Sequence, residues 1–289
     1  MHRRNPLIVA LCLIPVLLVG CKAAPRTLAQ ARDRSSSESN AWTKRGGASL
    51  PSSGGKLVLA EASVEFVTSK FETGDTRQAA FVPPHPVFLA AGAAGIGRRD
   101  VEFNDSAFER IADRIGATLR SDLAARGWTL IDPAGANTFT QFEALDAGEA
   151  RPVSELNFAA TDTGRMRAMR VQPTGSARVI TGPTGKRESA ARHALLNELG
   201  ADAVVRAIIR VGVYQGRASF EEGSRILLTT PAGDTVLSAG RSLLSDTEVL
   251  TEDATNGTLP ISESSYLNAV EETAPLFIKS ALDALTNES

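Results

Sequence analysis

Cysteine, histidine and aromatic residues are scarce in this 289-residue chain, which has two Cys, three His, two Trp and two Tyr. Surfaces that stack sugars or nucleic-acid bases rely on aromatic side chains, so an aromatic content of 5% argues against such a surface. Catalytic metal sites need clustered His, Cys or carboxylate ligands, and the few His and Cys residues disfavour zinc or haem. We therefore expect no cofactor, no metal site and no nucleic-acid partner.

The first 21 residues have the organisation of a bacterial export signal. Arg3 and Arg4 open it, an apolar run follows over residues 7–19, and the small residue Gly20 stands directly before Cys21. A helix needs about 20 apolar residues to cross a bilayer, and this run has 13. The pattern therefore predicts a removable signal peptide at residues 1–20 rather than a membrane span.

The sequence Leu-Val-Gly-Cys at residues 18–21 resembles the lipobox of bacterial lipoproteins, in which the cysteine is diacylated and the chain is cut just before it. The alternative is an ordinary signal peptide with a chance cysteine at the cut. Cys12 leaves with the signal, so without acylation Cys21 would be the sole thiol of an exported protein. In lipoproteins an aspartate after the cysteine favours the inner membrane. Lys22 stands there instead, which implies acyl chains such as palmitate in the outer membrane, facing the periplasm.

Residues 21–55 predict a lipidated, disordered tether, because Ser- and Gly-rich stretches alternate with charges and apolar residues are few. Its flexible residues would reach about 30–35 Å on average and roughly 110–120 Å when taut. Residues 1–55 carry a net charge of +6 and the remainder −8, which suits a basic tether beside an anionic membrane. Trp42 is the one feature that favours a binding site here over an inert leash.

Residues 56–289 predict a single globular domain that opens with a strand at 56–67. Its apolar residues occupy the even-numbered positions from Val58 to Phe66, and Glu61, Ser63 and Glu65 alternate with them. Such alternation is typical of a strand with one buried face and one face in water.

Three later segments have the apolar spacing of helices. The first opens with a capping box formed by Ser106 and Glu109. Gly127 is placed to end this helix, and Gly200 is placed to end a second helix at about 186–199. In the final amphipathic helix Pro275 removes one backbone donor and should introduce a kink.

The remaining strands are predicted at 128–131, 203–213, 217–229 and 235–244. Residues 135–185 lack a sustained period and predict an irregular insertion, with a short hairpin that turns at 173–176 between 165–172 and 177–181. The order β-α-β-(insert)-α-β-β-β-α predicts an α/β fold, with helices packed on a mixed sheet in one domain.

Catalytic patterns are weak in this chain. It has no Gly-x-Ser-x-Gly motif, and the glycine-rich stretches 92–97 and 182–186 lack the spacing of a phosphate-binding loop. His193 lies beside Arg192 in a predicted helix, which disfavours a serine triad. Neighbouring carboxylates are typical of solvated surfaces, and glycoside chemistry is their functional alternative. These pairs are Glu221 and Glu222, Glu252 and Asp253, and Glu271 and Glu272.

Four arginines of the predicted insertion stand out from an otherwise acidic body: Arg165, Arg167, Arg170 and Arg178. The simpler interpretation is that they keep the surface soluble. The functional interpretation is a docking patch for an anionic partner, such as peptidoglycan carboxylates or a protein.

Three stretches of the body resemble a group of periplasmic lipoproteins: 108–123, Gly-Trp-Thr-Leu-Ile-Asp at 127–132, and Leu-Gly-Ala-Asp-Ala-Val-Val at 199–205. The group includes the curli-secretion-channel family, the lipoprotein activators of penicillin-binding proteins and the amino-terminal domain of the Tol-system propeller protein. The resemblance covers about 105–132 and 186–245, under half of the mature chain.

The resemblance implies a non-catalytic role in building or activating an envelope assembly. A pore is not expected, because 165–181 is too short and too rich in arginine for transmembrane hairpins. We expect an outer-membrane lipoprotein that binds another envelope protein or the cell wall through 135–185 or the edge of the strand meander. Its oligomeric state stays open. The alternative from another class is an envelope hydrolase that uses carboxylates.

Overall fold

The computed structural model describes most of the domain and part of the preceding segment. The described residues are 25–33, 41–50, 54–71, 98–100, 105–133, 136, 153–161, 164–173, 185–214, 216–249 and 261–286. Within them, twelve strands form one sheet and four helices pack on it. The helices are α1 (Leu28–Asp33), α4 (Asp105–Ala125), α6 (Gly185–Leu199) and α7 (Glu263–Thr286). The predicted α/β fold with helices on a mixed sheet is confirmed.

Two long parallel strands form the centre of the sheet. They are β3 (Lys56–Phe71) and β8 (Ala203–Tyr214), and they pair from Leu57 with Ala203 to Phe66 with Val211. The other strands are β1 (Arg26–Thr27), β2 (Trp42–Gly46), β4 (Arg98–Asp100), β5 (Thr129–Ile131), β6 (Val153–Thr161), β7 (Gly164–Val171), β9 (Arg217–Phe220), β10 (Arg225–Thr230), β11 (Gly233–Ala239) and β12 (Leu243–Glu248).

The sheet branches on both sides of this central pair. Beyond β8, one arm continues through β10, β11 and β2, and the other through β9, β12 and β1. On its other side β3 pairs with β5 and then with β7, which in turn pairs with β6. The short strand β4 pairs with the end of β3. The described strands that pair with only one other strand are therefore β1, β2, β4, β5 and β6.

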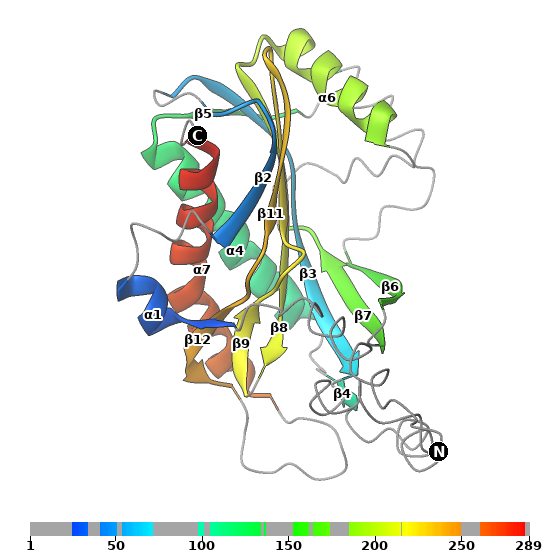
Figure 1. Ribbon diagram of the computed structural model, residues 1–289, viewed down its shortest axis with the longest axis vertical. Coiled ribbons are helices and arrows are strands. Elements are labelled where there is room, and N and C mark those ends of the chain that lie inside the picture. Colours follow the sequence, from blue (N-terminus) through cyan, green and yellow to red (C-terminus); the bar gives the residue numbers. More distant parts are fainter. Residues whose placement is uncertain are drawn as a thin grey trace, which may run out of the picture.

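Helices cover the two faces unequally, as Figure 1 shows. α4 and α7 lie against each other on one face, and α1 contacts α7. Together they bury the main core, in which Phe277 lies between Trp42 and Phe220 with ring centroids 4.9 Å from each. α6 lies on the opposite face, where Leu195 and Leu196 cover one end of β3 and β8.

The predicted disordered tether at 21–55 is wrong for the residues described there. β1 pairs with β12, β2 pairs with β11, and Leu28, Ala31 and Leu50 are buried in the main core. Trp42 supplies the largest anchor: it is 6% exposed, and its indole N–H donates to the Ser280 hydroxyl at 2.9 Å. The few apolar residues of this segment thus pack on α7 and the sheet instead of remaining in solvent.

Both predicted glycine helix stops are confirmed. Gly127 follows α4 with φ of 85°, and Gly200 follows α6 with φ of 56°, both in the left-handed region that glycine tolerates. After α4 the N–H of Gly127 donates to the Ala124 carbonyl, and the next N–H donates to the Leu123 carbonyl. This pair of bonds is the Schellman arrangement that satisfies helix-end carbonyls.

Two other helix predictions are a capping box at Ser106 and a kink at Pro275. The first differs from the structure, and the second stays a prediction. α4 begins at Asp105, so Ser106 lies inside the helix rather than before it, and its hydroxyl accepts from Arg110. α7 continues through Pro275, which lies on the exposed side of the helix. There the carbonyl that the proline leaves free can bind water.

The predicted insertion at 135–185 contains regular structure. β6 and β7 form a hairpin that closes between Thr161 and Gly164, and β7 pairs with β3 on its other side. The predicted pairing of 165–172 with 177–181 is therefore wrong, and residues 174–181 lie outside the described residues. In the meander, the predicted strand 217–229 is divided into β9 and β10, and 235–244 into β11 and β12. The turn predicted at 231–234 joins β10 to β11 as expected.

Candidate functional site

The polar side of β3 is buried, contrary to the prediction that it faces water. Glu61 and Glu65 are 0% exposed and Ser63 is 1% exposed. A bulge at Ala60 interrupts the pairing of β3 with β8 between Leu59 and Glu61. It moves Val58 and Ala60 to the α6 face, while the later apolar residues of β3 pack on α4. The even-numbered positions therefore do not share one face as predicted.

Arginines from two neighbouring strands neutralise the buried glutamates. On β8, Arg206 donates through Nε to Glu61, which also accepts from the Ser63 hydroxyl at 2.8 Å. Four residues further along both strands, Arg210 donates through Nη2 to Glu65 at 2.8 Å. On the opposite side of β3, the Nη2 of β7 residue Arg170 donates to the other oxygen of Glu65 at 2.5 Å. These contacts fix the register of β7, β3 and β8.

The two arginines determine the ionisation of Glu65. Burial raises the pKa of Glu65, but hydrogen bonds from Arg170 and Arg210 more than offset it and hold the pKa below its ordinary value. A general acid needs the opposite shift, a pKa raised toward neutrality. Glu65 is therefore unsuited to act as a general acid, and its contacts with Arg170 and Arg210 hold the three strands together.

A second polar cluster surrounds Asp234 at the start of β11. Its carboxylate accepts from the hydroxyls of Ser189 and Thr229, the latter at 2.6 Å, and lies 3.3 Å from Nε2 of His193. Burial raises the pKa of Asp234, but these two hydroxyl bonds, with the charge of Arg192, lower it overall. In a serine triad the histidine lies between the hydroxyl and the carboxylate. Here the Ser189 hydroxyl and the His193 ring each contact the Asp234 carboxylate directly. The geometry therefore does not fit a nucleophilic serine.

The carboxylate pairs noted in the sequence serve separate contacts. Glu221 is 7% exposed and accepts from the Ser219 hydroxyl. On α7, Glu271 forms an ion pair with Arg114 at 2.9 Å, and Glu272 forms one with Arg32 at 3.3 Å. Residues 252 and 253 lie outside the described residues.

The four arginines predicted as a docking patch are distributed as follows. Arg165 and Arg167 lie on β7, where the structure describes the backbone, and Arg178 lies outside the described residues. The side chain of Arg170 is 13% exposed and forms an ion pair with Glu65, so its charge is used inside the sheet. Docking through the other three stays a prediction. Cys21 also lies outside the described residues.

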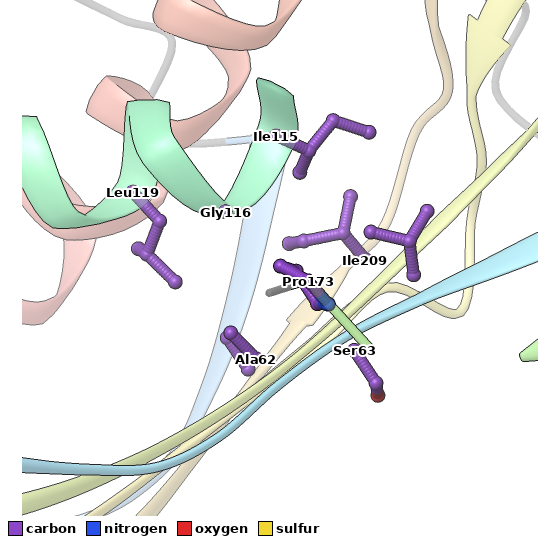
Figure 2. A pocket seen from close by; sticks show the side chains of 9 residues that line it. Ala62, Ser63, Ile115, Gly116, Leu119, Pro173 and Ile209 are labelled. Carbon is purple, nitrogen blue, oxygen red and sulfur yellow. The ribbon is translucent and has the colours of Figure 1, made fainter. Parts of the chain in front are cut away.

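A small hollow lies between α4 and the sheet, and Figure 2 shows Pro173, from the segment after β7, among the side chains that line it. The volume open to a water molecule is about 10 Å³, roughly one water. Ile115, Leu119 and Ile209 point into it, whereas the Ser63 hydroxyl points away. Other lining residues are Ala62, Val64, Gly116, Pro173 and Ala207. This hollow is a packing gap and has neither the size nor the polarity of a substrate site.

The outer strands of the sheet differ in their suitability for pairing with another chain. β1 is two residues long, β4 and β5 are three residues long each, and β2 is five residues long with Lys44 and Arg45. β6 is nine residues long, contains Glu155 as its one ionisable residue, and pairs on one side with β7. Among the described strands none pairs with its other side. Short or charged edges resist further pairing, whereas a long edge with little charge favours it.

Comparison with known proteins returned no family model, curated protein or solved structure that matches this chain. Within the described residues, no group of three or more His, Cys, Asp or Glu is arranged to hold a metal ion. A search of the described helices found none long and apolar enough to cross a membrane.

One signal in the sequence could have located the buried network. Glu61 and Glu65 are four residues apart, as are Arg206 and Arg210. Two parallel strands with the same spacing of opposite charges can pair both charges at once, which is the register that β3 and β8 adopt. No comparable signal was found for β6.

Proposed function

We propose that this protein is a lipid-anchored binding and assembly module of the bacterial outer membrane that faces the periplasm and has no catalytic activity. Cys21 carries the acyl chains, and the partner is another envelope protein or the cell wall. The observation that supports this proposal most is the outer edge of β6. This edge lies inside residues 135–185, the segment for which the sequence predicts partner contact.

The chemistry of an edge strand favours a protein partner over a polysaccharide. A strand at the edge of a sheet presents alternating N–H and C=O groups, and an incoming extended segment can pair with all of them. The nine residues of β6 offer a strand of ordinary length for such pairing. The proposal therefore commits to a partner that adds a strand beside β6.

The alternative, a carboxylate-dependent envelope hydrolase, receives less support. Glu65, Asp234 and Asp283 each have a pKa below the ordinary value. The acid of a glycoside hydrolase needs a raised pKa. Each of these three carboxylates accepts hydrogen bonds from its neighbours.

The experiment that tests the proposal is recovery of the partner through a tag at the carboxyl terminus. Deletion of all of 135–185 is unsuitable, because it removes Arg170 from Glu65 and the fully buried Val171 from the core. Single substitutions in β6, Leu156→Pro and Asn157→Pro, are sharper, since neighbouring N–H groups point to opposite sides of a strand. One of the two prolines removes an N–H that faces the outer edge, and the other removes an N–H that faces β7 and so interrupts that ladder.

We expect thermal unfolding to distinguish the outward-facing proline variant from the inward-facing one. The outward proline leaves the unfolding temperature unchanged and removes the partner from solubilised membranes, whereas the inward one lowers the unfolding temperature. If the outward variant still recovers the same partner in the same amount, the proposed binding edge is wrong.

A further inference from the structure

The chain joins the fold very soon after the predicted lipid anchor. Pro25 is the first described residue, and the N–H of Arg26 already donates to the Ser242 carbonyl at 3.0 Å. Arg26 and Thr27 pair in parallel with Leu243 and Leu244 of β12. In α1, which follows directly, Leu28 and Ala31 are 0% exposed. The segment is thus fixed to the body from its first strand onward.

This attachment limits how far the body can stand from the membrane. Three residues lie between Cys21 and Pro25, which makes four steps along the chain. An extended chain spans at most about 3.6 Å per residue, so the two Cα atoms are at most about 14 Å apart. A folded chain of roughly 230 residues has a radius of gyration of about 17 Å and is about 45 Å across. The segment from Cys21 to Pro25 is shorter than the domain is wide. The domain therefore cannot turn the end that lies far from Pro25 toward the bilayer.

We infer that one end of the domain, formed by the start of β1 and the turn at 240–242, rests against the lipid bilayer. This inference rests on the proposed acylation of Cys21. Gly240 is exposed, and its N–H donates to the carbonyl of Ala41, the residue before β2. The turn therefore lies beside the start of β2. Two residues further along, the Ser242 carbonyl accepts from the N–H of Arg26. The body does not extend from the membrane on a 110–120 Å tether, as a free leash would allow.

Charge at this end is compatible with anionic headgroups. Arg241 lies in the turn and is partly exposed. Arg26 is only 6% exposed, and burial, with the charge of Arg241, lowers its pKa to about 10, which leaves its guanidinium protonated at neutral pH. Lys22 lies within the leash itself. Positive charges close to the bilayer surface are attracted to anionic lipids.

The test uses the two ends of one strand. Gly240 follows the last residue of β11 and Ala232 precedes its first, and both are exposed. At about 3.3 Å per residue the two positions lie roughly 26 Å apart. Cysteine at either position, Gly240→Cys or Ala232→Cys, is labelled with a fluorophore in the full acylated protein. The protein is then reconstituted in phosphatidylethanolamine and phosphatidylglycerol vesicles that contain a headgroup-quencher lipid.

We expect loss of fluorescence at position 240 and retention at position 232. A matched variant carries a Gly- and Ser-rich linker of about 30 residues between Ala24 and Pro25, which restores a reach of about 30 Å. In that variant the quenching at 240 is expected to disappear. Equal quenching at both positions, or quenching at 240 that survives the linker, overturns the inference.

The unsubstituted mature chain separates failure of this inference from failure of the anchor. Cys12 is removed with the signal and an acylated Cys21 has no free thiol, so this protein should take up no thiol-reactive label. Labelling of the unsubstituted chain would show that Cys21 is free, and the anchor in the proposed function would then be wrong. An unlabelled chain with the wrong quenching pattern contradicts only the orientation.

Discussion

The substitution Glu65→Gln is expected to lower the free energy of unfolding by about 3–5 kcal/mol, because it leaves two arginines buried without their counter-charge. Glu65 is 0% exposed, and the side chains of Arg170 and Arg210 are 13% and 14% exposed. Chemical denaturation at pH 7 measures the loss. The substitution keeps the shape of the side chain, so a cavity does not contribute to it.

The same contact predicts how stability depends on pH. Burial raises the pKa of Glu65, but the bonds from Arg170 and Arg210 hold it below the ordinary value of 4.5. A lowered pKa contributes stability above the unfolded-state value, and this contribution is lost as the pH falls through the lower, folded-state value. The difference between the unsubstituted protein and Glu65→Gln should therefore be full near pH 7 and shrink below pH 4.5.

Glu271→Gln is the matched control. Glu271 and Arg114 also form an ion pair, at 2.9 Å, but their side chains are 46% and 58% exposed. Water screens such a pair, so its loss should change the free energy of unfolding by at most about 1 kcal/mol. Equal effects of the two substitutions would contradict the assignment of Glu65 as a buried neutralised charge.

Trp42→Ala is expected to lower the free energy of unfolding by about 3–5 kcal/mol, the usual cost of emptying a buried aromatic site. The ring packs on Phe277, and its N–H donates to the Ser280 hydroxyl, so α7 loses both an apolar and a polar contact. Release of β2 should also expose residues 41–50 to protease. Denaturation and limited proteolysis measure the two effects.

Arg45→Ala is the control on the same strand. Arg45 is exposed, and surface substitutions of this kind usually change stability by no more than about 0.5 kcal/mol. Two results together would support the original prediction of a disordered tether. Trp42→Ala would be as stable as the unsubstituted protein, and protease would already cleave residues 41–50 of the unsubstituted protein.

The elements that could be predicted from the sequence carry their own local signals. α4 and α6 each have a regular apolar spacing and a glycine stop, Gly127 or Gly200, and β8 is a long run of β-branched residues. These features act within a few residues of one another. The α/β class followed from their order.

The N-terminal elements could not be predicted, because their stability comes from distant contacts. β2 and α1 contribute few apolar side chains, too few to show a period. The partner of Trp42, Ser280, is 238 residues away in the sequence. Composition therefore indicates disorder, although each apolar residue finds a site in a core formed elsewhere.

The buried network has the same explanation. Glu61 and Glu65 lie in a pattern typical of a water-facing side, and the arginines that neutralise them on β8 are 145 residues away. The bulge at Ala60 also has no local signal, yet it decides which residues share a face. The candidate site was predicted as a segment, 135–185, but its edge strand β6 was not, since its alternation is interrupted by small residues.

Photo-crosslinking in cells tests the central claim, partner binding at β6, most directly. A photo-reactive residue replaces Leu156 or Asn157 in β6, and Glu109 on the exposed side of α4 serves as the control position. The account predicts a crosslinked product of fixed mass from the β6 positions and none from position 109. No product from β6, or the same product from all three positions, would contradict it.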